Sequence, residues 1–161
     1  MEQLQQASID RLAQRGVAIS DIEAGTRAFL EPKYHLTVEA VRLSEAVTKV
    51  LHKDEVADII LTALYIDEQA ETMSDSNPLK ARLARDANGH NVDELMAIGI
   101  TQQFSAAATV HYGLLDDQKP GLIGEINDRT DSVNVYLDDI LAALIASAAM
   151  TYLELAGGNN Y

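Results

Sequence analysis

The chain has 161 residues and a strongly unbalanced charge, with 12 lysines and arginines against 25 aspartates and glutamates and a formal net charge of −13. A protein this acidic is repelled by the phosphates of nucleic acids and by bare anionic lipid surfaces, so we expect no nucleic-acid partner. The sequence has no cysteine, which excludes disulfides, thiolate zinc sites and a cysteine nucleophile.

Length and composition predict one all-α domain, residues 1–161. The chain is 47% hydrophobic but only 5% aromatic, and with only 3 prolines this composition favours long helices over twisted sheets. The N-terminal residues are too polar for a signal peptide. The longest apolar run, residues 140–150, is shorter than the roughly 18 to 20 residues of a membrane span. We therefore expect a cytoplasmic protein, with at most peripheral contact with the inner face of the membrane.

Two helices are predicted in the first part of the chain. The first covers residues 2–15, where apolar residues recur at near-helical spacing, and Gly16 ends it. Ser20 and Glu23 form a capping-box pattern that begins a second, short helix. This helix is expected to end before Pro32, because the residue preceding a proline is disfavoured in the helical region.

Two further helices are predicted. Thr37 is the expected cap of the first, and Asp54 begins the second. The second of these carries apolar residues at helical spacing and fades near Met73. A short basic segment follows at residues 79–85 and leads into a polar loop at residues 86–91. The basic segment is a candidate for peripheral membrane docking, although a solvated helix face has the same pattern.

The C-terminal half is predicted to contain two long helices with a loop between them. The first covers about residues 93–110 and the last about residues 133–155, where Gly157 and Gly158 end it. Residues 112–132 contain glycine and proline and are expected to be mostly loop, with one helical turn after Gly121. The last helix is rich in alanine on nearly every face, so we expect it to lie at the centre of a bundle of about six helices.

Three acidic segments are candidates for chemistry. Asp93 and Glu94 begin a predicted helix, where the helix dipole favours carboxylates, and Asp93 is also typical of an ordinary N-cap. Asp116 and Asp117 lie within reach of Lys119 before a Pro-Gly turn. Acids that hold a metal beside a lysine that neutralises a phosphoryl oxygen would suit phosphate chemistry, although a solvated turn has the same composition.

The third acidic segment, Asp138 and Asp139, falls inside a predicted helix, where capping does not explain it. Adjacent residues lie about 100° apart around a helix, so the two carboxylates point in different directions. Burial of an unpaired carboxylate is prohibitive. Either one of the two acids faces solvent, or both approach a bound cation, and both alternatives stay open.

Magnesium is the cation that such oxygen ligands suit, because it bridges carboxylates and substrate phosphates. The four histidines show no metal-ligand spacing. Only His90, in the loop before Asp93, is a candidate acid or base.

Four segments in order resemble the successive motifs of the phosphatidylglycerophosphatase A family, and the spacing between them is similar. They read VDELMA at residues 92–97, YGLLD at 112–116, KPG at 119–121 and YLDDILAA at 136–143. With weaker upstream matches the resemblance covers most of the chain. It is strongest to the soluble branch of Gram-positive bacteria, which includes a protein named for a low-temperature requirement; the enterobacterial members are membrane-embedded.

The resemblance implies an activity and a set of site residues. The family removes the terminal phosphate from phosphatidylglycerophosphate, giving phosphatidylglycerol, and depends on Mg²⁺. The resemblance therefore implies that the acidic ligands or bases, and thus the candidate metal and catalytic residues, are Asp93, Glu94, Asp116, Asp138 and Asp139. It implies that Lys119 contacts the phosphate, and it leaves open which acid has which role.

Two alternative functions stay open beside the phosphatase. Glu55 with Asp58, and Glu68 with Glu71, resemble the ExxD and ExxE pairs that helical nucleotide pyrophosphohydrolases use to hold magnesium, in reverse order. Both pairs are also typical of solvated helix faces. The second alternative is a non-catalytic relative that keeps the fold as a homo-oligomer, since an alanine-rich last helix and short apolar-faced helices favour self-association.

Overall fold

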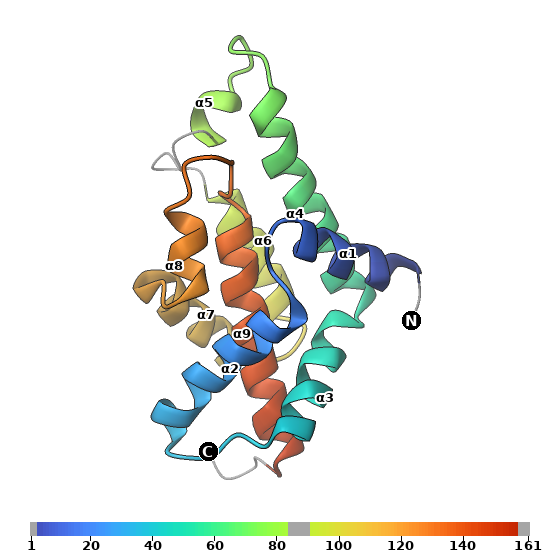
Figure 1. The fold of residues 1–161 in the computed structure, drawn as a ribbon, viewed down its shortest axis with the longest axis vertical. Coiled ribbons are helices and arrows are strands. Elements are labelled where there is room, and N and C mark those ends of the chain that lie inside the picture. Colours follow the sequence, from blue (N-terminus) through green and yellow to red (C-terminus); the bar gives the residue numbers. More distant parts are fainter. Residues whose placement is uncertain (1–2, 84–90, 158–161) are drawn as a thin grey trace.

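The structure is a computed structural model that describes residues 3–83 and 91–157. In these two ranges it contains nine helices and no strand, which confirms the all-α class (Figure 1). The helices are α1 (Gln3–Gln14), α2 (Ile19–Tyr34), α3 (Ala40–Leu51), α4 (Asp54–Thr72), α5 (Lys80–Leu83), α6 (Val92–Thr101), α7 (Ala106–Gln118), α8 (Leu122–Asn127) and α9 (Leu137–Leu155).

The last helix, α9, forms the centre of the fold, as its alanine content predicts. It runs through the middle of the bundle in Figure 1, and 16 of its 19 residues are buried. Helices α2, α3, α6, α7 and α8 all contact it. Small side chains on nearly every face allow this close approach from several sides, and Gly25 of α2 shows how close it is. A Cβ at Gly25 would lie 2.4 Å from the Ile145 side chain.

The described helices outnumber the six expected, because residues 93–132 contain parts of three helices where one long helix was predicted, and the short basic segment forms α5. The expected helix at 93–110 breaks after Thr101, and Ser105 begins α7 as an N-cap that accepts a hydrogen bond from the Ala108 N–H at 3.1 Å. Helix α7 then continues to Gln118, where a loop was expected. It ends at Lys119, whose backbone is left-handed with φ of 42°.

Three predicted helix boundaries in the N-terminal half are wrong. Helix α2 passes through Pro32, which lies in its last turn, where a proline interrupts little of the helix. The cap of α2 is Ala18 with Asp21, whose carboxylate accepts from the Ala18 N–H at 2.7 Å, so Ser20 is not the cap. The cap of α3 is Glu39, whose longer carboxylate accepts from two backbone N–H groups, and Thr37 lies upstream of it.

Some predictions fall outside the described residues, namely His90, Gly158 and the end of the basic segment at residues 84–85. The described part of that segment is α5, where Lys80 pairs with Asp75 at 2.8 Å. None of the helices in the described ranges is both long enough and apolar enough to cross a membrane.

Candidate active site

The start of α9 is fixed by Asp67, a fully buried residue of α4. Its carboxylate accepts hydrogen bonds from the Tyr136 N–H at 3.2 Å and from the Leu137 N–H at 3.1 Å. Asp67 therefore caps α9 from another helix. Burial raises the pKa of Asp67 to about 7, although the two backbone N–H donors lower it. This cap fixes the backbone from which the next two residues project.

Arg15, just after α1, holds the segment that precedes α9. Its guanidinium donates to the Val133 carbonyl and, at 3.0 Å, to Asn134 Oδ1. It also pairs with Glu71 of α4 at 2.9 Å. These contacts, with the Asp67 cap, keep residues 133–136 out of the helix, so α9 begins at Leu137 and not near Val133 as expected.

Asp138 and Asp139 consequently lie in the first turn of α9, and the expectation that they lie in a helix interior is wrong. The helix dipole favours acids there. Both are nevertheless only 4% exposed. The alternative in which one of them faces solvent is therefore excluded by the structure, and both carboxylates need a compensating partner.

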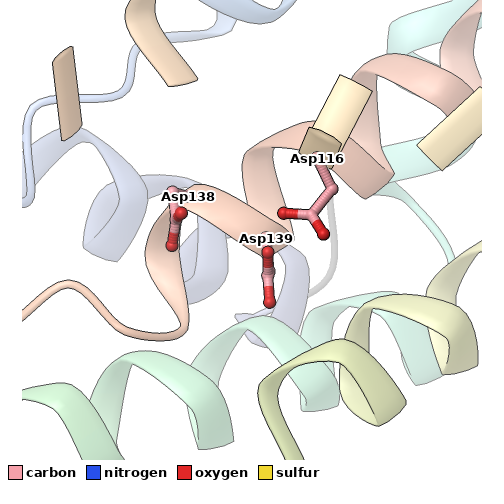
Figure 2. A group of neighbouring side chains, drawn as sticks. All are labelled: Asp116, Asp138 and Asp139. Carbon is pink, nitrogen blue, oxygen red and sulfur yellow. The ribbon is translucent and has the colours of Figure 1, made fainter. Parts of the chain in front are cut away.

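Asp116 of α7 joins this pair. One carboxylate oxygen from each of Asp116, Asp138 and Asp139 lies within 4.8 Å of the other two. Figure 2 shows Asp138 and Asp139 projecting from the start of α9, with the Asp116 carboxylate reaching toward Asp139. We call these three residues the acid cluster. An all-oxygen group of this kind fits Mg²⁺.

Lys119 is the cation that faces the acid cluster in the described structure. Its Nζ lies 2.9 Å from Asp116 Oδ1 and 2.8 Å from Asp138 Oδ2. Burial lowers the pKa of Lys119, but the hydrogen bonds to Asp138 and Asp116 outweigh it and raise the pKa above its usual range. Lys119 therefore stays protonated. It is positioned by the end of α7 and by Gly124 of α8, where a Cβ would lie 2.5 Å from the Lys119 carbonyl oxygen.

The pKa of Asp139 is strongly perturbed. Burial, the charge of Asp138 and a hydrogen bond with Asp116 raise the pKa of Asp139 to about 10. In the cation-free protein this raised pKa favours the protonated form of Asp139 at neutral pH. Three ionised carboxylates and one ammonium would carry a net charge of −2, which a divalent cation would neutralise.

Asp93 and Glu94 lie at the start of α6, beside the acid cluster but outside it. Asp93 is buried, and its negative charge raises the pKa of Asp139 further. Its Oδ1 accepts from the Glu94 N–H at 2.9 Å, whereas the Glu94 side chain is exposed. The structure thus brings four of the five predicted acids to one region, where all but the half-buried Asp116 are buried and Glu94 lies at the edge.

Tyr112 was predicted only as part of a motif, and the structure gives it a place in the site. It is 4% exposed, and its hydroxyl has no hydrogen-bond partner among the described residues. Burial and the charges of Asp139, Asp116, Glu94 and Asp93 raise the pKa of Tyr112. The signal in the sequence was helical spacing, since residues four apart share a helix face and Tyr112 therefore lies beside Asp116.

The acids that suggested a pyrophosphohydrolase have a different environment. Glu55 and Asp58 are exposed. Glu68 pairs with Arg11 at 3.1 Å, and Glu71 pairs with Arg15. These four acids of α4 form ion pairs or a solvated face, and they do not converge on one another as a metal-binding group within the described residues.

Known proteins resemble this chain over most of its length. It is 38% identical over 142 residues to YutG of Bacillus subtilis strain 168, a match that covers 86% of this chain and 84% of that protein, which is named as uncharacterized. A solved structure of a protein of unknown function from Bacillus stearothermophilus has a TM-score of 0.88 and 33% identity, over 94% of this chain and 99% of that one. The low temperature requirement C protein of Listeria monocytogenes has a TM-score of 0.88 and 32% identity, over 99% of both chains.

The model of the family described as phosphatidylglycerophosphatase A matches residues 13–154, which include all three acidic segments and the acid cluster. This confirms the resemblance seen in the four sequence motifs. The chain belongs to the phosphatidylglycerophosphatase A family.

Proposed function

We propose that this protein is a magnesium-dependent phosphatase that hydrolyses phosphatidylglycerophosphate to phosphatidylglycerol and phosphate. Membership of the phosphatidylglycerophosphatase A family supports the reaction class. The observation that carries the proposal is the convergence of Asp116, Asp138 and Asp139 beside Lys119. These groups come from two helices, α7 and α9, and the mutual repulsion of the three carboxylates makes a cation site favourable.

The acid cluster would hold the cation, with Asp93 adding negative charge beside it. A bound Mg²⁺ would supply Lewis acidity toward a phosphoryl oxygen and would lower the pKa of a bound water. The raised pKa of Asp139 suits this acid to accept a proton and to return it during hydrolysis. We propose that Asp139 acts as the base.

Lys119 would bind the substrate phosphate. It carries its charge at the edge of the acid cluster, and the short α7–α8 turn fixes its backbone. An ammonium in this place stabilises charge that develops on phosphoryl oxygens. The Tyr112 hydroxyl, which lacks a partner in the described structure, would donate a hydrogen bond to the bound phosphate or its leaving oxygen.

The test uses phosphate release from detergent-dispersed phosphatidylglycerophosphate, with and without Mg²⁺. Asp138→Asn keeps the shape of the side chain and removes its charge, so we expect at least about a 100-fold loss of kcat. The matched control is Asp117→Asn, because Asp117 is adjacent in sequence to the acid cluster but exposed, and its activity should match the wild type.

Two results would overturn the proposal. One is equal phosphate release from Asp138→Asn and wild type. The other is no release by the wild type, which would leave the non-catalytic relative as the better description.

Self-association and peripheral membrane contact stay predictions. The described surface exposes several large apolar side chains on different helices, including Val41 of α3, Leu95 of α6 and Val110 of α7. Light scattering on the purified protein measures whether it forms a homo-oligomer.

A further inference from the structure

An apolar pocket of about 570 Å³ lies between α2 and the α7–α8 turn. Its α2 wall comes from small residues on successive turns, including Ala24 and Ala28, and Ile145 of α9 also lines it. The opposite wall is formed by the end of α7 and the start of α8. The volume is within the range of about 300 to 1,000 Å³ that small-molecule sites occupy.

The lining of this pocket suits a hydrocarbon. Leu114, Leu115 and Ile123 contribute much of the α7–α8 side. Its charged residues are Asp21 and Lys33, and the Lys33 ammonium lies over the Phe29 ring at 5.6 Å. A polar ligand placed deep in this pocket would lose its hydrogen bonds to water without gaining new ones, whereas an apolar chain would gain the hydrophobic effect.

The pocket and the acid cluster share structural elements. Asp138 and Ile145 are seven residues apart, so they lie on one face of α9, two turns and about 10 Å apart along its axis. Pro120 and Gly121, which line the pocket, directly follow Lys119. The same turn therefore presents an ammonium to the acid cluster and an apolar wall to the pocket.

We propose that this pocket binds one hydrocarbon chain of the substrate whose phosphate lies at the acid cluster and Lys119. The proposal rests on the proposed function and adds to it a binding site for one acyl chain of the lipid substrate. The chain supplies binding energy through the pocket, and the phosphate is oriented by the α7–α8 turn. A phosphate monoester without an acyl chain would be oriented by the turn but would gain no binding energy from the pocket.

The test fills the pocket from its rim. Ala24 and Ala28 are exposed residues on consecutive turns of α2, so Ala28→Phe and Ala24→Phe each add bulk without replacing a buried core residue. The matched control is Ala107→Phe, at an exposed alanine of α7 outside the pocket. Thermal unfolding of each variant establishes that it is folded.

Two substrates are compared: dioctanoyl phosphatidylglycerophosphate and its deacylated, water-soluble headgroup. We expect Ala28→Phe to lower kcat/KM at least about tenfold for the acylated substrate and to leave kcat/KM for the headgroup unchanged. Ala24→Phe should act in the same direction, and Ala107→Phe should change neither value. Equal effects on both substrates, or no effect on either, would overturn the pocket proposal while leaving the proposed function intact.

A binding measurement separates the two proposals. A phosphatidylglycerol analogue with one fluorescent acyl chain, used below its micelle concentration, should bind the wild type and Asp138→Asn equally and Ala28→Phe at least about tenfold more weakly. This result would support the pocket even if the wild type releases no phosphate. Binding of the probe that is unchanged by Ala28→Phe and Ala24→Phe would contradict it.

Discussion

The protein carries acid-rich segments in two regions, and they differ in what surrounds each carboxylate. On α4, Glu68 and Glu71 have arginine partners, and Glu55 and Asp58 face solvent. On α7 and α9, Asp116, Asp138 and Asp139 face one another with Lys119 as the cation among them. The sequence shows acids at helical spacing on α4 and adjacent acids on α7 and α9. Burial and mutual approach, which depend on the tertiary fold, distinguish a candidate metal site from an ion-paired surface.

The largest expected difference between the two regions appears when one acid of each is neutralised. Asp139→Asn should lower kcat at least about 100-fold, because it removes the proposed base and a cation ligand. Glu68→Gln should keep kcat within about twofold, and since a surface ion pair contributes roughly 0 to 1 kcal/mol, it should hardly change the free energy of unfolding. Steady-state phosphate release and urea titration measure both. If Glu68→Gln were the more damaging change, the α4 pairs would be the functional acids.

A second expectation concerns Asp67, the residue of α4 that contacts the start of α9. Asp67 lies on α4 among the paired acids, but its carboxylate caps α9. Asp67→Ala should destabilise the fold by about 2 kcal/mol, because two backbone N–H groups lose their buried acceptor. Urea unfolding measures this, with Asp58→Ala, at an exposed residue of the same helix, as the control. Wild-type stability in Asp67→Ala would show that the start of α9 does not depend on this cap.

The smallest expected effect is that of Tyr112→Phe. The substitution removes a buried hydroxyl that has no partner among the described residues, so the free energy of unfolding should stay the same or rise slightly. Phosphate release should fall about tenfold if the hydroxyl donates to the substrate in the transition state. A stability loss of about 2 kcal/mol with full activity would instead assign the hydroxyl a structural role.

The pattern of apolar and small residues predicted much of the architecture. An alanine-rich helix must be approached closely, so its central place followed from composition, and Gly16 and Gly157 mark helix ends where their positive φ angles require glycine. Boundaries set by distant residues could not be predicted. Asp67 lies 69 residues before the Tyr136 N–H it binds, and no local signal in either segment indicates that contact.

The site could be predicted only in part, because local spacing in the sequence indicates contacts within a helix but not contacts between helices. Helical spacing places Lys119 beside Asp116, and the observed ion pair agrees with it. The partnership of Lys119 with Asp138 depends on how α7 packs against α9, which no spacing reveals. Asp138 and Asp139 were singled out because they were expected in a helix interior. They lie in a first turn instead, and their burial is what makes them informative.

Calorimetric titration with Mg²⁺ tests the central claim most directly. Because the folded pKa of Asp139 is raised to about 10, the cation-free site holds a proton at pH 7 that a cation must displace. We predict one Mg²⁺ per chain, release of about one proton measured in two buffers of different ionisation enthalpy, and affinity that rises as the pH rises from 6 toward 9. Asp139→Asn should abolish both signals. Binding that is absent, independent of pH, or retained in Asp139→Asn would contradict a cation site at the acid cluster.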